Sequence, residues 1–170
     1  MLAAYTGLAL GGAIVAPIAL PITPINSKWF NANGDFREEI GWPDLAKEAA
    51  RIYQAVPSTE RDSTGIFAAN YGEAGAIAMY RDEYGLPKPM GWTNTYWLRS
   101  YPSSPPQRLI VLGLHRESAD ALFEHCELAG HNGNSYGVKN EESEDHPDIF
   151  LCGGPRKGWP DFGRQHRHFG

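Results

Sequence analysis

The chain has 170 residues, a net charge of −5 and two cysteines. This length suits one domain of ordinary size. The acidic balance argues against a nucleic-acid partner, because phosphate backbones are held by clusters of lysine and arginine.

The N-terminal segment is apolar and carries no charge before Lys28. Its stretch LAAYTGLALGGAIVAPIALPI is long enough to cross a bilayer as a helix, which takes about 20 apolar residues, and membrane helices tolerate glycine and proline. Trp29 and Phe30 follow it, as aromatic residues often do at a membrane interface. A signal peptide and a buried core helix are alternatives, but no basic residue precedes the apolar run. We therefore predict a transmembrane helix over residues 1–25, a linker over 26–41 and an α/β domain over 42–170.

The polar remainder alternates amphipathic stretches with short apolar runs. We expect helices over residues 41–56, 73–84 and 117–126, and strands over 65–69, 108–113, 126–130 and 148–152. Gly85 is placed to cap the second helix. Alternating helices and apolar strands predict an α/β fold with a small, mostly parallel sheet flanked by helices.

The stretch NYGEAG follows the first strand and opens a helix, as phosphate-binding turns do. Gly72 and Gly75 would let the backbone approach a ligand. Their spacing matches neither the dinucleotide nor the phosphate-loop pattern, and the Glu73 carboxylate would repel a phosphate. A neutral ligand such as a sugar remains open, held by Asn70, Tyr71 and Glu73. We favour the simpler interpretation, in which Asn70 caps the helix and Glu73 supports its first turn.

The stretch GWTNTYWLRSY is rich in aromatic residues. Asn94, Tyr96 and Trp97 could form a carbohydrate platform or a membrane-facing edge. The alternative is a strand whose aromatic side chains pack on the sheet. Both interpretations stay open.

Other candidate sites are weaker. The six histidines show no metal-ligand spacing, so we expect no metal. The acidic run over residues 141–148 could do acid–base chemistry or bind a cation, but such runs are more often solvated loops. Cys126 and Cys152 would be free thiols in the cytosol, whereas outside it a disulfide could close the long loop between them.

The stretch TGIFAANYGEAGAIAMYRDEYGLPKPMGWTNTYWL resembles a segment near the C-terminus of certain bacterial membrane glycosyltransferases. That family is similar to dolichyl-phosphate-mannose–protein mannosyltransferases and to the lipid A aminoarabinose transferase. The shared features are a Gly-Ile strand, an Asn-Tyr-Gly-Glu-Ala-Gly block, a Gly-Leu-Pro and an Asn-x-Tyr-Trp. The apolar N-terminal segment looks like the family's last membrane helix, and NEESEDHPDIFLCGGPRKGWPDF looks like its closing segment. Arg81 and Asp82 depart from the pattern, since a glycine is common there.

The resemblance implies an enzyme of the bacterial cytoplasmic membrane that takes a sugar from a polyprenyl-phosphate donor and passes it to an extracytoplasmic acceptor. The family's catalytic carboxylates lie in an N-terminal, multi-helix part, so no catalytic residue carries over to this sequence. We expect an accessory C-terminal piece, inactive alone and without a cofactor, whose α/β domain lies outside the cytoplasm. Its expected partners are membrane lipid, the remaining membrane helices, and a glycan or polyprenyl-linked sugar.

Two other classes of protein remain. One is a stand-alone, membrane-anchored glycan-binding module. The other is a free-standing nucleotide-binding or hydrolytic enzyme of flavodoxin-like shape, which the position of Glu73 disfavours.

Overall fold

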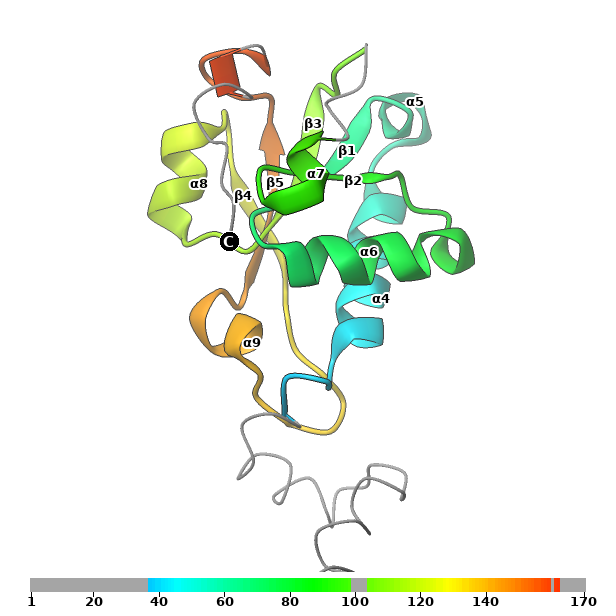
Figure 1. Ribbon diagram of the computed structural model, residues 1–170. Helices are drawn as coiled ribbons and strands as arrows, with labels where there is room; N and C mark the ends of the chain where they lie inside the picture. Colours follow the sequence, from blue (N-terminus) through cyan, green and yellow to red (C-terminus); the bar gives the residue numbers. More distant parts are fainter. Residues whose placement is uncertain (1–36, 99–103, 160, 163–170) are drawn as a thin grey trace, which may run out of the picture.

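The computed structural model describes residues 37–98, 104–159 and 161–162. A central sheet carries helices on both faces (Figure 1). The described helices are α4 (Trp42–Ala55), α5 (Ser58–Arg61), α6 (Tyr71–Tyr84), α7 (Asn94–Leu98), α8 (Arg116–Leu122) and α9 (Glu141–Asp145). The described strands are β1 (Thr64–Ala68), β2 (Pro89–Gly91), β3 (Arg108–Leu112), β4 (Glu127–His131) and β5 (Asp148–Gly153).

The sheet has the strand order β2-β1-β3-β5-β4. Strands β2, β1 and β3 are parallel, with Ile66 of β1 opposite Ile110 of β3. Strand β5 runs antiparallel to both of its neighbours, β3 and β4. The predicted α/β class is confirmed. The prediction of a mostly parallel sheet is wrong, because only half of the described strand pairings are parallel.

One face of the sheet is covered by α4 and α6. Their inward side chains meet alternate residues of the strands, since successive residues of a strand point to opposite faces. The buried residues of this layer include Leu45, Ala49 and Ile52 of α4, Ala74 and Ile77 of α6, and Ile66, Ile110, Leu112 and Ile149 of the sheet. The two helices also pack against each other (Figure 1).

The other face is aromatic. Phe67 of β1 lies at its centre, 5.1 Å from Trp92, 5.3 Å from Phe123 and 5.4 Å from Phe162 between ring centroids. These edge-on and tilted arrangements are the ones that aromatic pairs prefer. Helix α8 covers part of this face through the fully buried Ala119. The sheet is therefore covered on both sides.

Helix ends follow local rules. Pro43 lies in the first turn of α4, where its missing N–H costs nothing. Helix α6 ends at Gly85, whose φ of 66° is left-handed, as predicted.

No helix within the described residues is long and apolar enough to cross a membrane. The span predicted over residues 1–25 lies outside those residues.

Candidate functional site

The connections leaving β1 and β3 diverge at one edge of the sheet. Helix α6 leads from β1 to β2, on one side of the sheet. Helix α8 leads from β3 to β4, on the other side. In open α/β sheets, ligands bind at such a switch point, beyond the carboxyl ends of the strands. The residues that follow β1 and β3 are therefore the first place to look for a site.

Asn70 is the N-cap of α6. Its side-chain oxygen accepts a hydrogen bond from the backbone N–H of Glu73 at 2.9 Å. The capping interpretation is confirmed, and it leaves Asn70 committed to its own helix. Nearby, the Thr93 hydroxyl donates to the carbonyl of Ala69 at 2.7 Å and so ties the end of β1 to the segment before α7.

Glu73 faces the sheet rather than solvent. Only 1% of its surface is exposed, and its Oε2 atom is buried with no hydrogen-bond partner among the described residues. Oε2 lies against Gly113, just beyond β3, where a β-carbon would collide with it. Burial, aided by the charge of Glu142, raises the pKa of Glu73 to about 8. At neutral pH most molecules therefore carry a neutral acid here, so the expected phosphate-repelling carboxylate is absent.

Glu142 of α9 reaches the start of α6. Its Oε1 would lie 3.3 Å from a β-carbon at Gly72, and its buried Oε2 has no hydrogen-bond partner among the described residues. Burial first, and then neighbouring acids, raise the pKa of Glu142. A helix N-terminus attracts anions. Here the chain's own carboxylate lies where a bound phosphate would be expected.

Both glycines of the predicted turn lie inside α6. At Gly72 a β-carbon would lie 2.9 Å from the ring of Trp42, so the missing side chain makes room for internal packing. At Gly75 the nearest atom is the Tyr96 hydroxyl, 4.0 Å away. Neither glycine is required for the approach of a ligand.

The aromatic candidates separate from one another. Tyr71 is exposed at the start of α6. Asn94, Tyr96 and Trp97 form the short helix α7, so the alternative of a strand is wrong. Asn94, the first residue of α7, has a left-handed φ of 52°, which is not the backbone of an extended strand. The Tyr96 hydroxyl lies close to α6, 4.0 Å from where a β-carbon at Gly75 would be.

An open, polar cleft lies beyond the carboxyl end of β3, between the start of α8 and the α9–β5 connection. The His115 and His146 rings, 4.5 Å apart between centroids, come from opposite sides of it. Burial first, and then His115, lower the pKa of His146, so its imidazole is neutral at pH 7. Ser118 and Asp145 also line the cleft. These side chains can donate and accept hydrogen bonds, as a hydroxyl-rich ligand requires. No group of three or more metal-ligating side chains occurs within the described part of the chain.

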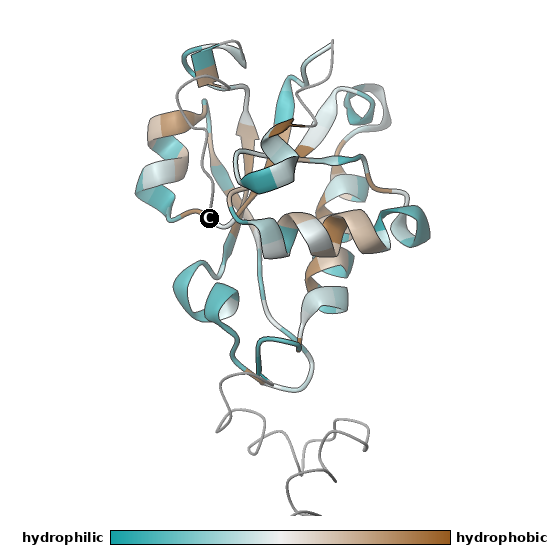
Figure 2. Ribbon diagram, viewed as in Figure 1, coloured by the Kyte–Doolittle hydropathy of each residue, from teal (hydrophilic) through white to brown (hydrophobic). Residues whose placement is uncertain are grey.

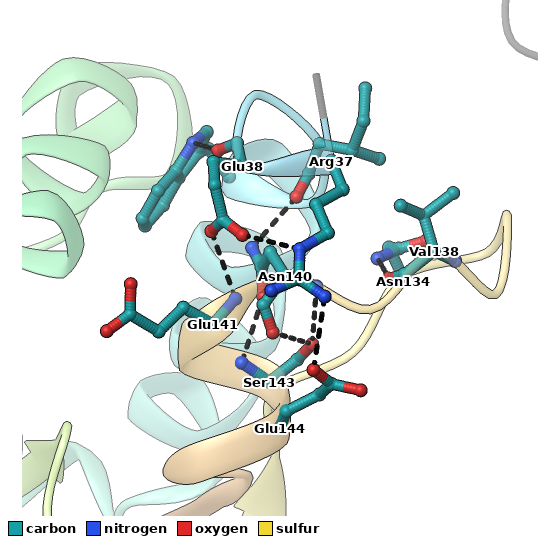
Figure 3. Close-up of polar contacts among 10 residues, drawn as sticks. Arg37, Glu38, Asn134, Val138, Asn140, Glu141, Ser143 and Glu144 are labelled. Carbon is teal, nitrogen blue, oxygen red and sulfur yellow. Dashed lines mark hydrogen bonds and ion pairs between the residues drawn. The ribbon is translucent and has the colours of Figure 1, made fainter. Parts of the chain in front are cut away.

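Helix α9 is fastened to the segment that precedes α4 (Figure 3). Buried Asn140 accepts a hydrogen bond from the Ser143 N–H at 2.9 Å and donates one to the carbonyl of Ile40 at 2.9 Å. The Glu38 carboxylate accepts from the N–H of Glu141 at 3.0 Å. We call these contacts the α9 latch.

Arg37 adds ion pairs to the α9 latch, with Glu38 at 2.9 Å and Glu144 at 3.3 Å. The Trp42 indole N–H donates to the carbonyl of Glu38 at 2.8 Å. Residues 37–41, assigned to the linker from sequence, are thus held by the domain.

The inward position of Glu142 was not predicted, because a run of acidic residues gives no sign of which one turns inward. The α9 latch was not predicted either, although the Asn140–Ser143 spacing is that of a capping box and could have indicated the start of α9.

Cys126 and Cys152 form a disulfide. Glu127 pairs with Leu151 across β4 and β5, which brings the two cysteines opposite each other. The bond joins the edge strand β4 to β5.

The chain matches no protein-family model, no curated protein and no solved structure.

Proposed function

We propose that this chain is the accessory, extracytoplasmic C-terminal part of a bacterial membrane glycosyltransferase that uses a polyprenyl-phosphate sugar donor. The observation that carries the proposal is the Cys126–Cys152 disulfide. Disulfides persist in oxidising compartments and are rare in the cytosol, so the bonded pair supports an exported domain. The sequence resemblance supplies the enzyme family, and the apolar residues 1–25 supply a membrane anchor.

In this proposal the domain contributes binding, not chemistry. Glu73 is buried, with its carboxyl group against Gly113, so it is not accessible to a substrate. The accessible groups are those of the cleft, where His115, Ser118 and Asp145 can exchange hydrogen bonds with sugar hydroxyls. We assign this cleft to a glycan of the acceptor or of the polyprenyl-linked donor.

The compartment is tested by the state of the two thiols. The chain is expressed in a bacterium, membranes are isolated in the presence of N-ethylmaleimide, and the intact mass is measured without reductant. We expect the mass of the disulfide form with no maleimide adduct. Two adducts would place the domain in a reducing compartment and contradict the proposal.

The accessory role is tested by activity. The chain alone should transfer no sugar from a polyprenyl-phosphate donor, whereas the enzyme that also contains the multi-helix part should do so. Sugar transfer by the isolated chain would show that its catalytic groups lie within these 170 residues.

A stand-alone, membrane-anchored glycan-binding module is the second candidate, favoured by the same open cleft. It predicts glycan binding by the chain in the absence of any partner helix. Titration of the chain in nanodiscs with oligosaccharides, compared with His146→Ala, tests the cleft that both candidates use. The gene distinguishes the two: codons for further apolar helices directly upstream of Met1 support the transferase, and a stop codon there supports the module.

A further inference from the structure

The loop over residues 133–139 lies at the end of the domain where the chain enters. Asn134 accepts hydrogen bonds from the N–H groups of Tyr136 and Val138 and donates to the Val138 carbonyl at 2.6 Å, which fixes the loop's shape. A β-carbon on Gly41 would lie 3.2 Å from the Asn134 amide nitrogen, so the loop packs on the entry segment. Figure 1 shows this loop, α9 and the start of α4 together at one end of the molecule.

The entry segment cannot swing away from this loop, because the α9 latch holds it. Arg37, Glu38 and Ile40 are each bonded to α9 or to its cap. The position at which the chain leaves the membrane therefore determines which end of the domain faces the membrane.

The chain length between membrane and domain is short. If Trp29 and Phe30 mark the interface, as aromatic residues often do, only residues 31–36 separate it from Arg37. Even fully extended, these six residues span about 22 Å. Helix α4 then rises about 21 Å away from the entry end, since 14 residues rise 1.5 Å each. Helix α5, which follows α4, lies at the opposite end of the molecule (Figure 1).

The surface chemistry of the loop suits a lipid headgroup layer. Tyr136 is 38% exposed and is one of five large apolar side chains exposed among the described residues. Tyrosine prefers membrane interfaces, where its ring and hydroxyl sit at the level of the headgroups. Helix α9 beside it is hydrophilic and acidic (Figure 2), so it belongs in the hydrated outer part of the headgroup layer and not in hydrocarbon.

We propose that residues 133–139, with Tyr136 at their centre, contact the phospholipid headgroups and turn the carboxyl edge of the sheet, with its polar cleft, toward the membrane. This placement rests on the proposed membrane anchor. It brings the glycan-binding groups toward the surface at which a polyprenyl-linked sugar is held.

The test measures the distance of the loop from lipid. Two variants of the full chain, Ser135→Cys and Thr59→Cys, are labelled with bimane and reconstituted in phosphatidylcholine–phosphatidylglycerol vesicles. Both native residues are exposed, and Thr59 lies on α5 at the far end. We expect a lipid carrying a nitroxide on its headgroup to quench the label at position 135 at least twofold more than the label at position 59. Intact mass confirms the Cys126–Cys152 bond in each variant.

Three results would overturn the placement. Equal quenching at the two positions would mean that the loop does not approach the membrane. A label at position 135 that is shielded from both the nitroxide lipid and aqueous iodide would mean that protein covers the loop. If carbonate strips the chain from vesicles, the anchor and the proposed function fail together, whereas the first two results leave the proposed function standing.

Discussion

At the scale of single residues, Glu73 makes stability depend on pH. Its pKa is about 8 in the folded state because it is buried near Glu142, against an ordinary value of 4.5. The folded state thus keeps a proton that the unfolded chain releases, so the free energy of unfolding falls as pH rises from about 4.5 to about 8 and levels off above that. The slope approaches about 1.4 kcal/mol per pH unit.

The variant Glu73→Gln should remove most of this slope, because an amide of the same shape does not titrate. Urea unfolding between pH 5 and pH 9 measures it. Glu117→Gln, an exposed acid in the first turn of α8, serves as the control and should keep the slope. A Glu73→Gln variant as pH-dependent as the parent would mean that Glu73 is not buried as described.

The two glycines of α6 should respond in opposite ways to alanine. Gly72→Ala forces a methyl group against the Trp42 ring and should lower the free energy of unfolding by about 1–3 kcal/mol. Gly75→Ala meets no close contact, only the Tyr96 hydroxyl at 4.0 Å, and should raise it by about 0.5–1 kcal/mol, because alanine is the better helix former. Denaturant titration of both variants at one pH makes the comparison. Equal effects of the same sign would contradict the packing of Trp42 on α6.

The sequence predicted some of these residues and not others. Asn70 was recognised as a cap because capping depends on a local spacing of residue types. The burial of Glu73 was not, because a glutamate in the first turn is equally typical of an exposed position. What turns it inward is Gly113, some 40 positions along the chain, and no local pattern contains that information.

At the scale of secondary-structure elements, α9 depends on Asn140. The variant Asn140→Ala removes the helix cap and the hydrogen bond to Ile40 and leaves the Ile40 carbonyl without its partner. We expect a loss of about 1–3 kcal/mol in the free energy of unfolding and faster proteolysis within residues 133–146. The control is Asn134→Ala, which leaves both Asn140 hydrogen bonds in place. It should leave α9 as protected from proteolysis as in the parent protein.

The apolar strands and the longer helices were predicted because their patterns are local and strong. The short helix α7 was not, since its aromatic residues are typical of strands. The direction of β5 was also missed. An alternation of helices and strands favours parallel pairing, but α9 has only five residues and does not carry the chain back across the sheet. Of the site, the sequence predicted the edge after β1 but not the cleft beyond β3, which forms only when His115 and His146 are brought together from distant segments.

At the scale of the whole molecule, the disulfide should contribute much of the stability. It closes a loop with a sequence separation of 26, for which loop entropy gives about 3.5 kcal/mol. The variant Cys126→Ser/Cys152→Ser should lose that amount in urea unfolding and become insensitive to dithiothreitol. The parent protein in dithiothreitol should match the variant. If dithiothreitol does not change the free energy of unfolding of the parent protein, the Cys126–Cys152 disulfide is contradicted.

The position of β5 in the sheet sets an order of assembly. Strands β1, β2 and β3 can pair as soon as they are made, but among the described strands β4 has no neighbour except β5, which comes later in the chain. During synthesis, β4 therefore waits with both of its edges unpaired until the residues of β5 arrive between it and β3. The cysteine of β5 arrives with that strand, so oxidation can seal the sheet only after its last strand is in place.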